Sequence, residues 1–178
     1  MRAPLSLTSR RLELTRLGEG DALEIFDGYA QDVEVTRFLT WTPRTHVGEV
    51  EDFITDRRRK WENAESFAWV LRLSSSGDLA GVIEARVDGH RLELGYAIIR
   101  RFWGDGLATE AVRAVVEWAA LEPAIRCVWA YTDVENLASG RVLEKAGLSR
   151  AGILEAWATH PNIASTPRDC HIYSLRLD

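Results

Sequence analysis

Cysteine is scarce in this sequence, and the two cysteines complete no recognisable pattern. Cys127 and Cys170 stand far apart, so they form neither the spacing of a metal site nor a disulfide framework. We therefore interpret them as buried thiols of a protein that works in a reducing compartment, and we expect it to bind no metal.

Long hydrophobic runs are also missing. No uninterrupted apolar stretch approaches the roughly 18 to 20 residues that a membrane-spanning helix requires. The first residues, from Met1 to Thr8, lack the apolar core of a signal peptide. Neither an internal repeat nor a low-complexity segment is present. These absences lead us to expect a cytoplasmic protein with no membrane partner.

The sequence has an acidic charge balance, with a net charge of −5 over 178 residues. General nucleic-acid binding is therefore disfavoured, because it relies on a basic surface. Apolar residues make up 46% and charged residues 28%, which is ordinary for a soluble globular protein. The length suits one domain, which we place at residues 1–178, and it allows a core without disulfides or metals.

The hydrophobic periodicity divides the chain into helical and alternating segments. We expect about four helices, at residues 21–28, 46–63, 104–121 and 136–146. We expect about seven strands, at residues 10–17, 67–73, 79–87, 91–100, 125–132, 148–157 and 168–177. Residues 29–43 show no clear period and are expected to be irregular. A strand meander followed by alternating strands and helices predicts an α/β (α+β) fold with a mixed, largely antiparallel sheet.

One segment combines several features of an anion site. Gly104-Asp105-Gly106 joins an expected strand to a long helix, and Arg100 and Arg101 add positive charge beside it. Glycines let a backbone approach a ligand closely, and a helix N-terminus presents unpaired N–H groups to phosphate. On these residues alone, a tight structural turn is an equally good interpretation. The segment fits neither a Walker motif nor a dinucleotide fingerprint.

Several segments together resemble the GNAT superfamily of N-acetyltransferases. Arg101–Gly106 resembles the family's pyrophosphate loop, Gln/Arg-x-x-Gly-x-Gly/Ala, and Leu107–Ala111 resembles its continuation. Asn136–Ser139 and Leu143–Leu148 are similar to elements of the RimJ/RimL-type branch of ribosomal-protein N-terminal acetyltransferases, as is the opening strand Arg10–Leu14. The likeness covers almost the whole chain, and the motifs occur in the family's order.

The resemblance implies the GNAT acyl-CoA N-acyltransferase fold and direct transfer of an acetyl group from acetyl-CoA to a primary amine in a ternary complex. In such proteins a strand end binds the pantetheine arm and loop amides bind the pyrophosphate. The next strand, here Val128–Thr132, diverges to leave a slot for the thioester. The residues implied to bind acetyl-CoA are Ala97, Ile98, Ile99, Arg101, Trp103, Gly104, Asp105, Gly106, Leu107, Ala108, Thr109, Asn136 and Ser139.

The reaction needs a base for the amine, an N–H group for the oxyanion and an acid for the leaving thiolate. Ser139 is the candidate acid, with a hydroxyl that only caps a helix as the alternative. Glu93 is the candidate base, acting through water, with a solvated or paired carboxylate as the alternative; Glu84 comes second. A backbone N–H near Ile98 is the candidate oxyanion donor. Ala158 stands where some ribosomal-type relatives place a carboxylate, so their base is not carried over.

The acceptor would be an amine-bearing small molecule or a peptide N-terminus. The candidate substrate residues are Trp41, Glu84, Tyr131, Trp157 and His160, with core packing of the aromatics and an exposed loop position of the histidine as alternatives. An acidic chain suits a cationic acceptor weakly, and an exposed last strand could support a homodimer. Two other functions stay open, namely a non-catalytic acyl-CoA sensor with a GNAT-like fold and a different nucleotide-binding α/β protein.

Overall fold

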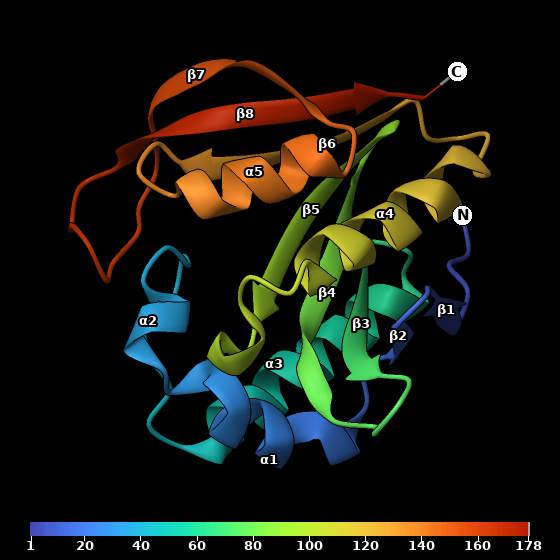
Figure 1. Ribbon diagram of the computed structural model, residues 1–178, viewed down its shortest axis with the longest axis vertical. Helices are drawn as coiled ribbons and strands as arrows, with labels where there is room; N and C mark the ends of the chain where they lie inside the picture. Colours follow the sequence, from blue (N-terminus) through green and yellow to red (C-terminus); the bar gives the residue numbers. More distant parts are fainter. Residues whose placement is uncertain (178) are drawn as a thin grey trace.

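The computed structural model describes residues 1–177, and its frame is a mixed sheet of eight strands (Figure 1). Asp178, the last residue of the predicted domain, lies outside the described residues. The strands are β1 (Ser6–Thr8), β2 (Leu12–Arg16), β3 (Ser66–Leu73), β4 (Leu79–Asp88), β5 (Arg91–Ile98), β6 (Cys127–Asp133), β7 (Ser149–Ala158) and β8 (Arg168–Arg176). Their order in the sheet is β1-β2-β3-β4-β5-β6-β8-β7. Only the pair β5 and β6 is parallel within these described strands.

Helices cover both faces of the sheet. The α-helices of the described residues are α1 (Ala22–Ile25), α2 (Val33–Thr36), α3 (Val47–Glu62), α4 (Leu107–Ala120) and α5 (Leu137–Lys145). A π-helical turn, Phe26–Ala30, extends α1. Figure 1 shows α4 and α5 on one face of the sheet, with α1 and α3 on the other. Each face buries its own apolar cluster, one packed under α4 and the other under α1 and α3.

The prediction of a mixed, largely antiparallel sheet is confirmed, with eight strands in place of about seven. The additional strand β1 is only three residues long, which is too short to show an alternating pattern. The segment expected to be irregular contains α2, whose first turn is held by the side chain of Asp32, which accepts a hydrogen bond from the backbone N–H of Glu34 at 2.9 Å. The strand expected to reach Arg100 ends at Ile98, because a 3-10 turn, Arg100–Phe102, follows it.

The sheet is divided between β5 and β6. Their register joins Arg91 to Cys127, Leu92 to Val128 and Glu93 to Trp129, and no pairing follows within the described residues. Both strands nevertheless continue, to Ile98 and Asp133. The separation expected of these strands is therefore present, and it leaves the facing backbone edges of both strands without partners from the sheet.

Candidate active site

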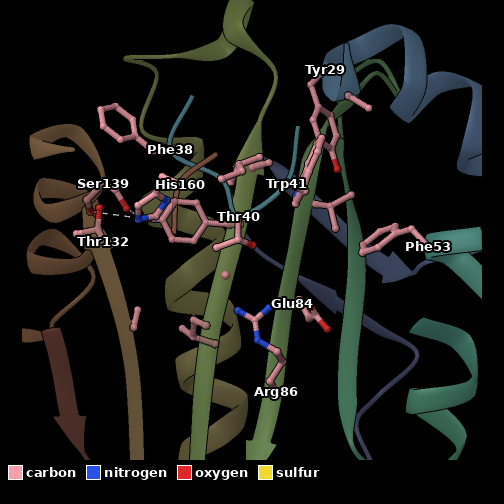
Figure 2. Close-up of a pocket in the computed structure, with 18 of the residues that line it drawn as sticks. Tyr29, Phe38, Thr40, Trp41, Phe53, Glu84, Arg86, Thr132, Ser139 and His160 are labelled. Atoms are coloured by element: carbon pink, nitrogen blue, oxygen red, sulfur yellow. Dashed lines mark hydrogen bonds and ion pairs between the residues drawn. The ribbon is translucent and has the colours of Figure 1, made fainter. Parts of the chain in front are cut away.

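A cleft of about 280 Å³ lies where β5 and β6 separate. Its walls come from β4, β5, β6 and α5, from the helices on the opposite face, and from the loops before α3 and after β7. Figure 2 shows Ser139 and His160 on one side of this space, Phe53 on the other, and Thr40 and Trp41 between them. The cleft therefore connects the two faces of the sheet through the opening between the strands.

The glycine loop opens directly into α4. Gly104 and Gly106 have φ values of 88° and 80°, in the left-handed region that favours glycine, and Gly106 is the residue that precedes the helix. No side chain caps this helix start, so its first N–H groups are free to bind an anion. The indole N–H of Trp103 donates to the carbonyl of Ile98 at 2.8 Å, which fixes the loop to the end of β5.

The other residues expected to bind acetyl-CoA surround this loop. Arg101 is exposed, and its guanidinium lies 4.7 Å from the ring centre of Phe102. Ala97 lines the cleft, whereas the side chains of Ile98 and Ile99 are buried. The backbone groups of Ile99 pair with Ala80 and Phe102. The Ile98 carbonyl accepts from Trp103, so of these backbone groups in residues 1–177 only the Ile98 N–H is left for a ligand. Asp105 is exposed, and Leu107 and Thr109 are buried at the start of α4, with Ala108 partly exposed between them.

Ser139 and Asn136 meet at the start of α5. Asn136 Oδ1 accepts a hydrogen bond from the Ser139 backbone N–H at 3.2 Å, so Asn136 caps this helix. The Ser139 hydroxyl is not used in capping, because its Oγ lies 2.8 Å from the hydroxyl of Tyr96. Burial raises the pKa of Tyr96, so its hydroxyl keeps its proton at neutral pH.

Tyr96 is a site residue that the sequence reasoning missed. It alternates in step with Leu94 and Ile98, which indicated a core position. It lines the cleft because β6 has already left β5 at this level, so the hydroxyl reaches across the opening to α5.

Both candidate bases, Glu93 and Glu84, are paired with arginines. Glu84 is 6% exposed and lines the cleft; it accepts from Ser66 Oγ and lies 2.7 Å from Arg57 Nε and 2.9 Å from an Arg86 nitrogen. Glu93 pairs with Arg86 at 2.7 Å and is absent from the described residues that line the cleft. Burial raises the pKa of Glu93, and the Arg86 charge opposes that rise.

The expected acceptor residues have different positions. Trp41, Tyr131 and His160 line the cleft. Trp157 is 49% exposed and is not among the described residues of the cleft wall; its ring packs edge to face against Tyr131, with ring centres 6.3 Å apart. His160 is 2% exposed, so the alternative of an exposed loop histidine is wrong. Its Nε2 lies 3.7 Å from Cys170 Sγ, and its Nδ1 has no hydrogen-bond partner in residues 1–177.

The loop between β7 and β8 is tied to the opposite wall of the cleft. The side-chain amide of Asn162 donates to the backbone carbonyls of Thr36 and Trp41, at 2.7 and 2.8 Å. These two hydrogen bonds join residues more than 100 positions apart in the sequence. No local pattern around Asn162 predicts them.

A buried ion pair supports the same loop. Asp133 is 1% exposed, and its carboxylate accepts hydrogen bonds from Arg168 at 2.6 and 3.2 Å and from the backbone of Glu135. Burial opposes ionisation of Asp133, but the bonds from Arg168 and Glu135 outweigh it, so its pKa is lowered. A lowered pKa stabilises the fold above the unfolded value of about 3.9, and this contribution is lost as the pH falls through the folded value.

Replacing Asp133 with Asn should therefore lower the free energy of unfolding by about 2 kcal/mol at neutral pH, because it removes the buried carboxylate and leaves the partly buried Arg168 with only Glu135, an exposed partner. The variant should also lose less of its free energy of unfolding than the wild type as the pH falls, because asparagine does not titrate. Urea unfolding over a pH series measures both effects. Asp56→Asn is the control, since Asp56 also pairs with basic side chains but is partly exposed. Equal stability of the two variants would contradict the buried-pair interpretation.

Residues 11–149 of the chain match the family described as the acetyltransferase (GNAT) domain. The chain belongs to this family. YoaA, an uncharacterised N-acetyltransferase of Bacillus subtilis, is 27% identical over 172 residues, which are 95% of each chain. The match confirms the expected class, an acyl-CoA-dependent acyltransferase, and contradicts the alternative of a different nucleotide-binding protein.

Solved acetyltransferases share the fold of this GNAT domain. Mycobacterium smegmatis RimJ, in complex with CoA-disulfide, is 17% identical with a TM-score of 0.87, over 99% of this chain and 90% of that chain. The microcin C7 self-immunity acetyltransferase MccE, in complex with acetyl-CoA and AMP, is 18% identical with a TM-score of 0.87, over 98% and 100% of the two chains.

The described residues of this GNAT domain contain neither a group of side chains suited to a metal ion nor a helix suited to span a membrane. Residues 1–177 hold no group of three or more histidine, cysteine, aspartate or glutamate side chains placed to bind a metal ion. Among the helices that the structure describes, none has the length and apolar character needed to cross a membrane.

Proposed function

We propose that the protein transfers an acetyl group from acetyl-CoA to the primary amine of a small molecule or peptide N-terminus, by direct attack in a ternary complex. The observation that carries the proposal is the opening between β5 and β6, where a cleft connects the face that holds α4, its glycine loop and α5 to the opposite face of the sheet. The relatives named N-acetyltransferases support the same class of reaction.

The residues around the loop fit the phosphates and arm of acetyl-CoA. A Cβ placed at Gly104 would meet nothing within 4 Å, and one at Gly106 would meet only Arg11, at 3.7 Å, so the space above both glycines is open. The amides of Gly104 to Ala108 would bind the pyrophosphate, with Arg101 and Thr109 beside them. The Trp103 amide, expected to join them, donates instead to the carbonyl of Arg100 at 3.1 Å. The free edge of β5 and the side chain of Asn136 would bind the arm. Acetyl-CoA supplies a thioester carbonyl that a neutral amine can attack.

Two side chains would then transfer the protons of the reaction, Ser139 in the cleft wall and Glu93 behind Arg86, which lines the cleft. Ser139 would give its hydroxyl proton to the departing sulfur, and a backbone N–H near Ile98 would stabilise negative charge on the carbonyl oxygen. Glu93 would receive the amine proton through water, since it lies beside Arg86 on the face of the sheet that α3 covers. Its raised pKa favours this role at neutral pH.

Replacing Glu93 with Gln should lower kcat about 100-fold and remove the fall in kcat/KM on the acid side of the pH profile, because a base must be unprotonated to act. Initial rates over a pH series measure both effects. Glu13→Gln, at an exposed strand position of β2, is the matched control. An unchanged pH profile in the Glu93 variant would show that Glu93 is not the base.

The proposal is tested by measuring release of the CoA thiol from acetyl-CoA with a panel of amines. The panel contains amino acids, polyamines, aminoglycosides and peptides with alanine or serine at the N-terminus. Release that depends on one class of amine supports acetyl transfer and identifies the acceptor class. Tight acetyl-CoA binding without release for any amine would instead favour the non-catalytic sensor.

A further inference from the structure

The charged side chains that line the cleft differ from those of the molecule as a whole. The chain carries a net charge of −5. The charged side chains in the cleft wall are nevertheless three arginines, Arg44, Arg57 and Arg86, against one carboxylate, Glu84. A ligand in the cleft therefore meets more guanidinium groups than carboxylates at the wall, although Glu49, Asp56 and Glu93 behind it neutralise much of their charge.

The carboxylates that pair with these arginines present few free oxygens to a ligand in the cleft. Glu84 is engaged by two guanidiniums and the Ser66 hydroxyl, so it offers no free oxygen to an ammonium group. The other partners, Glu49, Asp56 and Glu93, are absent from the described residues of the cleft wall.

Arg44 is the arginine best placed to bind an anion. Its guanidinium lies 4.9 Å from the ring centre of Trp41, and one of its nitrogens lies 3.1 Å from Glu49. Its backbone N–H donates to the carbonyl of Ala30 at 2.8 Å, which fixes the segment. The remaining guanidinium nitrogens have no partner in the part of the chain that the structure describes. A guanidinium held in this way offers two parallel donors to a carboxylate.

The rest of the cleft wall is largely aromatic, and the cleft itself is small. Tyr29, Phe38, Trp41 and Phe53 all line the cleft, and in Figure 2 Tyr29 and Phe53 lie on one side of it while Phe38 lies near Ser139 and His160 on the other. A cleft of about 280 Å³ is at the lower end of the range for small-molecule sites. It fits a compact acceptor with an apolar body, and not an extended polycation.

We propose that the acceptor is a compact amine with an aromatic or apolar body and one carboxylate, as in a hydrophobic amino acid, and that Arg44 binds the carboxylate. This inference rests on the proposed acetyl transfer. It separates the acceptor classes that the net charge left open, because multiply charged polyamines and aminoglycosides would meet the arginines with like charge.

The test compares L-phenylalanine with L-phenylalaninamide, with spermidine as a polycation, in an assay of acetyl-CoA-dependent amine acetylation by the full chain. The amine of the amide has the lower pKa, so a larger fraction of it is neutral near pH 7, and availability of the neutral amine favours the amide. A preference of about 10- to 100-fold in kcat/KM for the free acid is expected, which corresponds to one charge-assisted contact. Equal or better use of the amide or of spermidine would overturn the inference while leaving acetyl transfer intact.

Two variants connect the preference to Arg44. Arg44→Gln should reduce the acid-to-amide ratio about tenfold, through the KM of the acid, without changing acetyl-CoA affinity. Arg37→Gln is the matched control, because Arg37 is exposed, lies in the same segment and is outside the cleft wall among the described residues. An unchanged ratio in Arg44→Gln would overturn the assignment of Arg44. Failure to acetylate any amine would overturn the proposed function itself.

Discussion

Replacing Gly106 with Val should weaken acetyl-CoA binding about 100-fold or more while the protein stays folded, because losing two charge-assisted N–H bonds to phosphate has this effect. Gly106 has a φ of 80°, which a β-branched residue adopts only with strain. A valine at this position would turn the peptide groups of Gly104 to Ala108 away from the position in which they would bind the pyrophosphate. Titration calorimetry with acetyl-CoA measures the loss.

The control for this prediction is Gly89→Val. Gly89 has a φ of 58° in the turn between β4 and β5, so it bears a similar backbone penalty outside the glycine loop. Its variant should lose stability but bind acetyl-CoA as the wild type does. Equal acetyl-CoA affinity in the two variants would contradict a phosphate-binding role for the loop.

Replacing Ser139 with Ala should lower kcat at least about 100-fold with unchanged acetyl-CoA affinity, if its hydroxyl protonates the departing sulfur. The helix itself should survive, because the bond that caps α5 runs from the Ser139 backbone N–H to Asn136 and needs no serine side chain. Single-turnover rates and acetyl-CoA titration separate the two quantities. A wild-type kcat would remove Ser139 from the mechanism.

Tyr96 gives this prediction a second readout. If the hydroxyls of Tyr96 and Ser139, 2.8 Å apart, act as one unit, the double variant Tyr96→Phe/Ser139→Ala should be no slower than Ser139→Ala alone. Tyr173→Phe is the control, since the Tyr173 hydroxyl also lies against α5, at Gly140. Additive losses would show that the two hydroxyls act independently.

The features that the sequence predicted well are those with local causes. The loop at Gly104 and Gly106 could be located because positive φ and a helix start both leave a mark within a few residues. The separation of β5 from β6 came only through the family resemblance, because no residue within either strand specifies where its neighbour departs.

The features that the sequence did not predict depend on distant parts of the chain. Tyr96 has the alternation of a core residue and becomes a cleft residue only because β6 diverges. The burial of His160 could not be predicted, because it depends on the hydrogen bonds by which Asn162 holds the loop to Thr36 and Trp41. Local propensity contains no information about such contacts.

The ion pair between Arg86 and Glu93 was not predicted, although the sequence contains a local signal for it. The Asp88-Gly89 turn joins β4 to β5 as a tight hairpin, and counting back from Asp88 opposite Arg91 places Arg86 opposite Glu93. The register therefore implied the ion pair that the structure shows at 2.7 Å. The same counting places Gly95 opposite Glu84, where the missing side chain gives the Arg86 guanidinium room beside the cleft.

The most direct test of acetyl transfer measures two products in one sample. The wild-type protein is incubated with acetyl-CoA and the best amine of the panel, and the free CoA thiol and the acetylated amine are both quantified over time. Direct transfer in a ternary complex requires equal amounts of the two, and neither without the amine. CoA release without acetylated amine, or no release with any amine, would contradict acetyl transfer by this cleft.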